Sequence, residues 1–211
     1  SNKDKPFFAY LSFYSVHTPL IARGDLKQKY LAKEAPVDKY GRIGDKRLRL
    51  VQNHPAFAAM VEAMDQAVGK VLDKLEELGL DKNTAVFFMS DNGGVSTGGP
   101  TCTSNLPLKA GKGWLYEGGI REPMIIKAPG ITQAGTECSA PVTSTDFYPT
   151  ILELAGLSAV PQQHVDGVSL VPLLKGSDTL KRKAIYWHYP HYSGGLGGRP
   201  SSAVRSGDWK L

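Results

Sequence analysis

The fold is decided by residues 84–94, TAVFFMSDNGG, in which an apolar run ends at Ser90-Asp91-Asn92-Gly93-Gly94. The β-branched and aromatic residues of the run predict a buried strand, and the glycines after it predict a tight turn. A carboxylate and an amide therefore stand at the carboxyl end of a core strand, the edge at which open α/β sheets bind ligands. Their oxygens suit a hard cation such as calcium or magnesium, but Asp-Asn-Gly is equally typical of an ordinary turn.

The composition is that of a globular protein. The chain has 211 residues, 41% of them hydrophobic and 21% charged, which fits one domain or slightly more. The formal net charge of +5 and the pI near 9.1 are mildly basic. Much of the excess lies in residues 39–49, which is either a solvated loop or a contact surface for an anionic substrate. No aromatic-rich basic face or nucleic-acid motif is present, so a nucleic acid partner is not expected.

The cysteines and the chain ends carry less information. Cys102 and Cys138 lack metal-ligand spacing, and the sequence leaves open whether they form one disulfide or stay free. No signal peptide and no apolar stretch long enough to span a bilayer is present. The chain runs almost at once into an apolar segment, and residues 203–211 resemble a hairpin that stops within its second strand. Both ends therefore predict a piece of a longer protein.

The pattern along the chain predicts strands alternating with helices, hence an α/β sheet with helices on both faces. Residues 20–53 are predicted to be a basic insertion with short helical pieces. The loop of residues 93–113 is polar and is expected outside the core, and the loop of residues 194–200 is expected to be flexible. The expected strands are residues 6–14, 84–90, 124–128 and 184–189, followed by a terminal hairpin at 203–211. The expected helices are residues 55–78, 146–157 and 171–174, and the second of them is expected to be capped by Ser144 or Thr145.

Several residues with chemically useful side chains fall at strand ends or in the loops after strands. Each has an ordinary interpretation: a turn histidine, solvated lysines or an aromatic edge. Together they suit a charged oxyanion ester, because a cation polarises its non-bridging oxygens while lysine and histidine supply donors and a proton. The residues are His17, Asp91, Asn92, Lys109, Lys112, His188 and His191.

Residues 111–123, GKGWLYEGGIREP, resemble the Gly-Lys…Glu-Gly-Gly-x-Arg-x-Pro element of type I sulfatases. Similar likenesses cover nearly the whole chain: the strand and His-x-Pro loop at 7–19, the metal-binding segment at 90–93, the helix and loop at 145–156 and 166–170, and the strand at 186–190. The resemblance implies an alkaline-phosphatase-like fold, here as a partial domain. Residues 1–190 would then be the second half of the catalytic domain, with 20–53 as an insertion, and residues 191–211 the start of a truncated C-terminal subdomain.

The resemblance also implies roles for individual residues. Asp91 and Asn92 would be two of four protein ligands of a calcium ion. Lys112 would contact the sulfate and its bridging oxygen, with His17 beside it as donor or general acid. Lys109 lies three residues before the motif position, and His188 and His191 fall where family members vary, so these three are candidates for substrate binding only.

One element of the family pattern is missing. The nucleophile of these sulfatases is a cysteine oxidised to formylglycine within Cys-x-Pro/Ala-x-Arg, whose geminal diol would attack sulfur. Neither Cys102 nor Cys138 fits that pattern, and the acidic residues that complete the metal site are also absent. We therefore predict that this chain alone binds calcium weakly and has no sulfatase activity.

For the intact protein the sequence predicts a calcium-dependent sulfatase acting on a sulfated small molecule or glycan. The alternatives are a phosphodiesterase or phosphonate monoester hydrolase of the same fold, or a catalytically inactive binding protein on this scaffold. Unpaired sheet edges in a partial domain also predict dimerisation or strand exchange. Family members are commonly exported, but the sequence leaves the localisation open.

Overall fold

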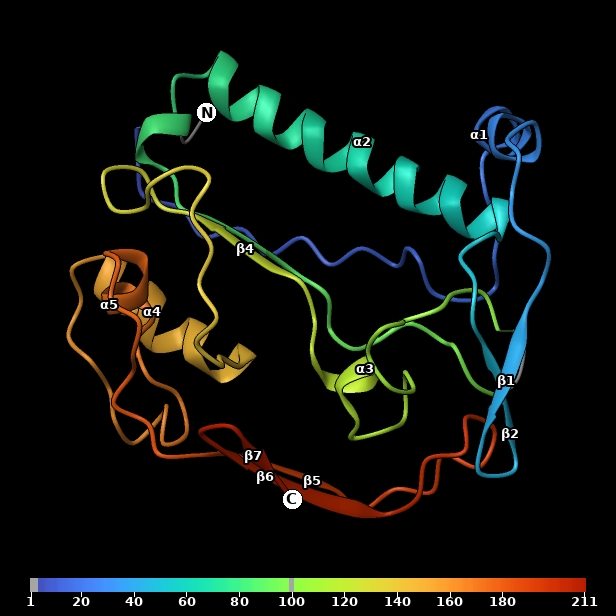
Figure 1. Cartoon of the computed structure of the whole chain (residues 1–211). Helices are drawn as coiled ribbons and strands as arrows, with labels where there is room; N and C mark the ends of the chain where they lie inside the picture. Colours follow the sequence, from blue (N-terminus) through green and yellow to red (C-terminus); the bar gives the residue numbers. More distant parts are fainter. Residues whose placement is uncertain (1–3, 99–100) are drawn as a thin grey trace. The chain divides into compact units, whose positions relative to one another are not determined.

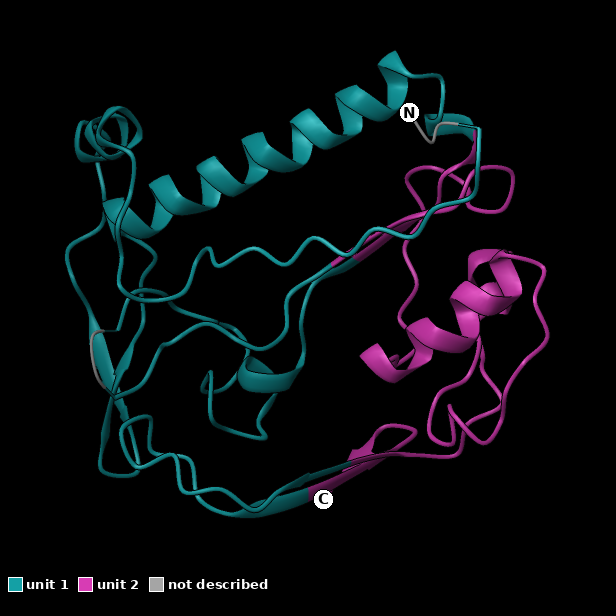
Figure 2. Ribbon diagram, turned by 180° about the vertical axis from the view of Figure 1, so that it is seen from behind, with its two compact units in different colours: residues 1–82, 89–124, 187–202 teal, residues 83–88, 125–186, 203–211 magenta. Residues whose placement is uncertain are grey.

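The computed structural model describes residues 4–98 and 101–211, which divide into two compact units (Figure 2). The first unit contains residues 1–82, 89–124 and 187–202, and the second contains residues 83–88, 125–186 and 203–211. Three small sheets are present in the described part of the chain, with strand orders β1-β2, β3-β4 and β5-β6-β7 (Figure 1). Every candidate site residue named from the sequence belongs to the first unit.

The first unit is built around the long helix α2, Pro55–Glu77, which confirms the helix expected at residues 55–78. His54 caps it by accepting a hydrogen bond from the Phe57 amide at 3.3 Å, and Pro55 stands in the first turn, where its missing N–H costs nothing. Helix α1, Gly24–Leu31, packs against α2 and is joined to it by an ion pair of 2.8 Å between Lys29 and Glu62. Arg23, just before α1, also contacts α2, because its Nη1 donates to Gln66 Oε1 at 3.0 Å.

The basic segment of residues 39–49 is a β-hairpin, not the solvated loop that the sequence left open. Strand β1, Tyr40–Ile43, pairs antiparallel with β2, Lys46–Arg49. Arg49 is buried, with its guanidinium 2.8 Å from both the Asp38 carboxylate and the Tyr40 hydroxyl. The Arg47 guanidinium lies 3.3 Å from the centre of the Tyr40 ring. The charges of Arg47 and Arg49, which look free in the sequence, are therefore engaged in contacts within the fold. For residues 20–53 the sequence predicted short helical pieces, of which α1 is one, but not this hairpin.

Much of the described part of the loop, residues 93–98 and 101–113, is buried, which corrects the expectation that the loop lies outside the core. Its small polar side chains are satisfied by backbone groups: Ser96 Oγ donates to the Ala110 carbonyl at 2.9 Å, and Thr97 Oγ1 donates to the Leu196 carbonyl at 2.8 Å. A polar segment can be buried at little cost once its groups are paired. The fully or nearly fully buried residues of the loop include Ser96, Thr97, Cys102, Thr103, Ser104 and Ala110.

The second unit contains most of the two-stranded sheet of β3, Val86–Met89, and β4, Met124–Lys127, together with the helices that follow. Helix α4, Phe147–Leu154, is preceded by the 3-10 turn Ser144–Asp146. That turn is capped by Thr143, not by Ser144 or Thr145 as expected, because Thr143 and Asp146 form a reciprocal capping box. The Asp146 carboxylate is fully buried and is 2.7 Å from Arg182 Nη1 and 3.0 Å from the Val168 amide. This network ties α4 to the segment that leads into α5, Val171–Leu174.

The remaining expectations divide clearly. Strand β5, Ile185–Tyr189, and the hairpin of β6, Ser201–Ser206, with β7, Trp209–Lys210, confirm the strand at 184–189 and the terminal hairpin. The strand expected at residues 6–14 is wrong, because no described strand lies beside it to complete a ladder, and its aromatic side chains are exposed. Helix α3, Glu117–Ile120, was not expected. The division into residues 1–190 and 191–211 and the expected dimerisation stay predictions.

Candidate functional site

The candidate site is built by a backbone junction between the turn after β3 and residues 109–119. The Gly93 amide donates to the Gly119 carbonyl at 3.2 Å, and the Lys112 amide donates to the Gly94 carbonyl at 3.1 Å. Asn105 braces the same junction, since its side-chain amide lies 2.9 Å from the Gly94 carbonyl and 3.0 Å from the Ala110 carbonyl. The Asp91-Asn92 pair and Lys112 are thus held to one another through main-chain contacts.

The glycines of this junction are required by close approach. A Cβ atom on Gly93 would lie 1.8 Å from the Gly118 carbonyl oxygen, and one on Gly119 would lie 2.1 Å from the Trp114 carbonyl oxygen. Backbone atoms cannot swing away as a side chain can, so only glycine fits at both positions. This explains in physical terms why Gly-Gly follows both Asp91-Asn92 and Glu117.

Asp91 and Asn92 present oxygens at the end of β3, as the sequence predicted. Asn92 Nδ2 donates to Asp91 Oδ2 at 2.5 Å, which aligns the two side chains. Glu122 is close enough to interact with them: burial, and then the charge of Asp91, raise the Glu122 pKa to about 7. Its Oε1 atom is buried and has no hydrogen-bond partner within the described chain. Sequence reasoning assigned Glu122 no role, and nothing in its spacing could have revealed the unpaired oxygen.

The two lysines of the loop differ in their surroundings. The Lys109 ammonium lies 3.8 Å from the centre of the Tyr116 ring, a cation–π contact that occupies it. Lys112 is half-buried, and none of the hydrogen bonds or ion pairs in the described residues involves its ammonium group. Lys112 is therefore the lysine with donors free for a ligand, in agreement with its position in the motif.

The three histidines are not brought into this junction by any described contact. His17 is exposed, with Nδ1 2.8 Å from the Thr18 carbonyl and its ring edge-on to Tyr14. His188 Nδ1 lies 2.9 Å from Ser202 Oγ, and His191 packs edge-on against Tyr189. A role for His188 or His191 in substrate binding stays a prediction.

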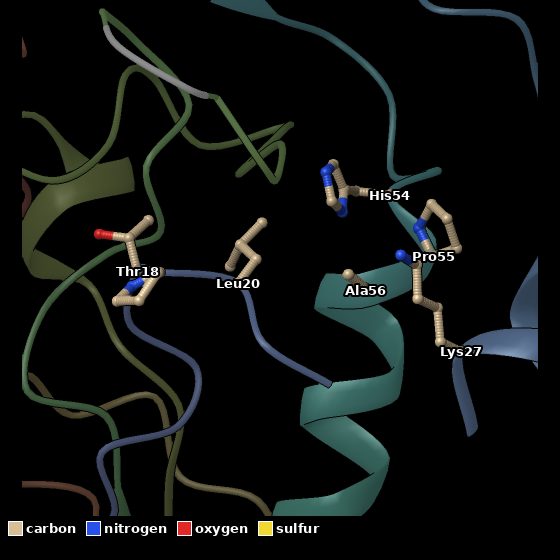
Figure 3. Close-up of a pocket in the computed structure, with 7 residues that line it drawn as sticks. Thr18, Leu20, Lys27, His54, Pro55 and Ala56 are labelled. Carbon is tan, nitrogen blue, oxygen red and sulfur yellow. The ribbon is translucent and has the colours of Figure 1, made fainter. Parts of the chain in front are cut away.

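A pocket of about 750 Å³ lies beside His17 in the first unit (Figure 3). Figure 3 shows Thr18 and Leu20 on one side and His54, Pro55 and Ala56, at the start of α2, on the other, with Lys27 next to Pro55 in this view. Burial, and then the charge of Arg49, lower the pKa of His54, so its ring stays neutral at pH 7. Most of its lining is apolar, with Thr18, Lys27 and His54 as the polar side chains.

Within residues 4–98 and 101–211, no group of three or more His, Cys, Asp or Glu side chains is arranged to hold a metal ion. The same described part of the chain has no helix of the length and apolarity needed to cross a bilayer. Cys102 is buried and Cys138 exposed, and both are free thiols. The disulfide that the sequence left open is therefore not formed.

Comparison with known proteins gives the junction its context. The profile of the Sulfatase family matches residues 1–157. The chain belongs to the sulfatase family. A second profile, N-sulphoglucosamine sulphohydrolase, C-terminal, matches residues 110–211, so the two profiles together extend over the whole sequence.

Relatives of this sulfatase chain are considerably longer than it is. A protein described as Sulfatase from Formosa agariphila is 39% identical over an alignment of 205 residues, which covers 91% of this chain and 34% of that protein. Arylsulfatase H of Homo sapiens is 36% identical over 196 residues, 89% of this chain and 30% of its own length. The chain thus spans about a third of the curated relatives it matches.

Solved structures confirm the alkaline-phosphatase-like fold of a partial domain. The crystal structure of Ps i-CgsB in complex with k-i-k-neocarrahexaose has a TM-score of 0.79 and 34% identity, and covers 99% of this chain and 41% of that one. A phosphonate monoester hydrolase, SpPMH from Silicibacter pomeroyi, is a more distant neighbour, with a TM-score of 0.54 and 25% identity over 72% of this sulfatase chain and 30% of its own.

Proposed function

We propose that the protein containing this chain hydrolyses sulfate esters, with Lys112 and His17 acting on the ester and Asp91 and Asn92 holding part of a calcium site. The observation that carries the proposal is the backbone junction of Gly93 and Gly94 with Gly119 and Lys112. It places two oxygen-bearing side chains and an unpaired ammonium group on segments that are fixed to each other. Membership of the sulfatase family supports the choice of reaction.

Lys112 suits the binding of a sulfate group. Its ammonium carries three N–H donors, and they stabilise the charge that grows on the oxygens as the ester bond breaks. Its half-buried position strengthens this attraction relative to water. The main chain at Lys112 is fixed because its amide donates to the Gly94 carbonyl at 3.1 Å.

His17 suits the protonation of the leaving oxygen. Its Nδ1 faces the Thr18 carbonyl at 2.8 Å, and a carbonyl only accepts, so Nδ1 carries a proton. The free atom is then Nε2, which bears a proton only in the imidazolium form. As a general acid His17 would therefore act as imidazolium, give the Nε2 proton to the leaving alcohol or phenol oxygen, and become neutral.

The residues present fit a partial calcium site. Asp91 and Asn92 supply hard oxygen donors, and the unpaired Glu122 Oε1 beside them marks a place that lacks a compensating positive charge among the described groups. A bound calcium ion would polarise the non-bridging oxygens of the ester. Two such ligands alone would leave the ion largely hydrated, which supports weak binding by the isolated chain.

Replacing Asp91 with alanine is expected to raise the calcium dissociation constant of the full-length protein at least about 10-fold, because a charged ligand is lost. Asp73→Ala is the matched control, since Asp73 is an exposed carboxylate on α2. Calcium content after dialysis and calcium titration by calorimetry provide the measurement. Equal calcium affinity in Asp91→Ala and Asp73→Ala would remove Asp91 from the site.

The isolated 211-residue chain is expected to show no turnover of 4-nitrophenyl sulfate, because neither of its cysteines lies in the sequence pattern of the family nucleophile. The full-length protein, assayed in parallel, is the positive control. Turnover by the purified chain above that of a Lys112→Ala version would show that the chemistry needs no residue outside these 211.

A phosphoester or phosphonate hydrolase is the second candidate, supported by the similarity to SpPMH. Both reactions use a metal and donors to oxyanion oxygens, so the junction alone suits either. The values of kcat/KM for 4-nitrophenyl sulfate and 4-nitrophenyl phenylphosphonate discriminate between them, and a higher value for the phosphonate would overturn the sulfatase proposal. A protein that binds both compounds but turns over neither would be the inactive binding protein.

A further inference from the structure

A second pocket, of about 410 Å³, lies in the first unit between the turn of the β1–β2 hairpin and residues 192–200. Figures 1 and 2 both show the chain before β6 passing beside the hairpin turn. The pocket is lined by two basic side chains, Lys46 and Arg199, one acidic side chain, Asp45, and the ring of Tyr192. Gly194, Gly197, Gly198 and Pro200 complete the wall, so the backbone is open to a ligand there.

The lining of this pocket carries a net positive charge, which favours binding of an anion. The Lys46 ammonium pairs with Asp45 at 3.3 Å, and Arg199 is near enough for its charge to act on the same carboxylate. One acidic side chain thus faces two basic ones, which leaves a net charge of +1 among the lining residues. The three arginines of the hairpin have other contacts: Arg42 Nη2 donates to the Asp45 carbonyl at 3.2 Å, Arg47 stacks on Tyr40, and Arg49 is buried against Asp38.

Tyr192 gives the pocket an exposed aromatic surface. Tyr192 is 89% exposed, so its ring is accessible to a ligand in the pocket. An aromatic face beside a cationic pair matches a sulfated sugar, whose ring has an apolar C–H face and whose sulfate carries a single negative charge.

The pocket is rigidly connected to the loop of Lys112. The turn of residues 193–198 is closed by the Ser193 amide donating to the Gly198 carbonyl at 3.1 Å. The Leu196 carbonyl accepts from Trp114 Nε1 at 3.0 Å, and a Cβ on Gly198 would lie 1.8 Å from the carbonyl oxygen of Gly113, the residue after Lys112. Residues 194–200, which were expected to be a flexible loop, therefore pack against the loop that carries Lys112.

We propose that this pocket binds a second, non-reacting sulfated sugar of a glycan substrate. Lys46 and Arg199 hold its sulfate, and Tyr192 covers one face of its ring. The assignment rests on the proposed sulfate ester hydrolysis, because Lys112 would hold the reacting sulfate while Gly113 and the adjoining turn form the wall that the next sugar meets. The pocket assignment therefore implies that the substrate is a glycan with at least two sulfated positions rather than an isolated aryl sulfate.

The test compares two probes on the full-length protein: k-i-k-neocarrahexaose, as a sulfated hexasaccharide, and 4-nitrophenyl sulfate, which has no second sulfate. Lys46→Ala, Arg199→Ala and Tyr192→Ala are each expected to raise the hexasaccharide dissociation constant about 10-fold. The same variants are expected to lose some kcat/KM for 4-nitrophenyl sulfate, but this fold-change should be at least about fivefold smaller than the fold-increase in the hexasaccharide dissociation constant. Tyr192→Phe keeps the ring and is expected to rescue binding, and Lys70→Ala, on the exposed side of α2, controls for loss of one positive charge.

Calorimetric binding separates this proposal from the proposed function. If sulfate is released from neither 4-nitrophenyl sulfate nor the hexasaccharide, but hexasaccharide binding still depends on Lys46, Arg199 and Tyr192, the sulfatase proposal fails and the pocket assignment stands. Hexasaccharide affinity that is absent in the unmodified protein, or unchanged in all three alanine variants, overturns the pocket assignment. An equal fold-loss of hexasaccharide affinity and of kcat/KM for 4-nitrophenyl sulfate also overturns it, because the turn of residues 193–198 would then only position Lys112.

Discussion

Replacing Lys112 with alanine is expected to lower kcat/KM of the full-length protein for 4-nitrophenyl sulfate about 10²- to 10³-fold, the effect typical of removing one preorganised donor to a developing oxyanion. Among the described contacts the Lys112 ammonium has no protein partner, so its removal breaks no interaction that holds the loop. The stability of the variant should therefore be close to that of the unmodified protein, and the loss should appear in kcat as well as in KM.

Lys109→Ala is the comparison variant for Lys112→Ala. The Lys109 ammonium is held over the Tyr116 ring at 3.8 Å, so its loss removes a surface cation–π contact and is expected to cost less than about 10-fold in kcat/KM. Steady-state kinetics and thermal unfolding of both variants provide the measurement. If Lys109→Ala lost more activity than Lys112→Ala, the roles of the two lysines would have to be exchanged.

The sequence predicted best the elements whose pattern is local. The apolar repeat with Pro55 and Gly79 at its ends predicted α2, and the run before Ser90 predicted β3. The segment of residues 6–14 has an equally strong strand pattern but forms no strand, because a strand depends on a partner that its own residues do not specify. Pattern therefore predicts a helix more safely than it predicts membership of a sheet.

The candidate site was predictable where a motif fixes chain position and unpredictable where burial decides. Asp91, Asn92 and Lys112 follow from two motifs, and the structure adds the hydrogen bonds that join them. Glu122 and Arg49 look like solvated charges in the sequence, but long-range packing buries an oxygen of the first and the whole side chain of the second. Lys46, Tyr192 and Arg199 are far apart in the sequence, so only the fold shows that they line one pocket.

Replacing Gly93 with alanine is expected to lower kcat/KM at least about 10²-fold and to destabilise the protein by roughly 3 kcal/mol. The new Cβ would lie 1.8 Å from the Gly118 carbonyl oxygen and 2.9 Å from the Gly119 Cα, both of them backbone atoms. The turn must then move away from residues 118–119, which breaks the 3.2 Å hydrogen bond from the Gly93 amide to the Gly119 carbonyl. Asp91 and Asn92 would move with it, away from the segment that holds Lys112.

The controls for Gly93→Ala separate the junction from a general effect of alanine. Gly69 lies in the middle of α2 with open space around its Cβ position, so Gly69→Ala is expected to raise stability by up to about 1 kcal/mol and leave activity unchanged. Asn105→Ala loosens the same junction without a clash, because it removes the side-chain donor to the Gly94 and Ala110 carbonyls, and it should lower activity and calcium affinity together. Urea unfolding, calcium titration and steady-state kinetics on the three variants are the measurements. Full activity in Gly93→Ala, or in Asn105→Ala with the junction loosened, would mean that the turn of Asp91 and Asn92 and the loop of Lys112 act independently. The backbone junction could then no longer carry the proposed function.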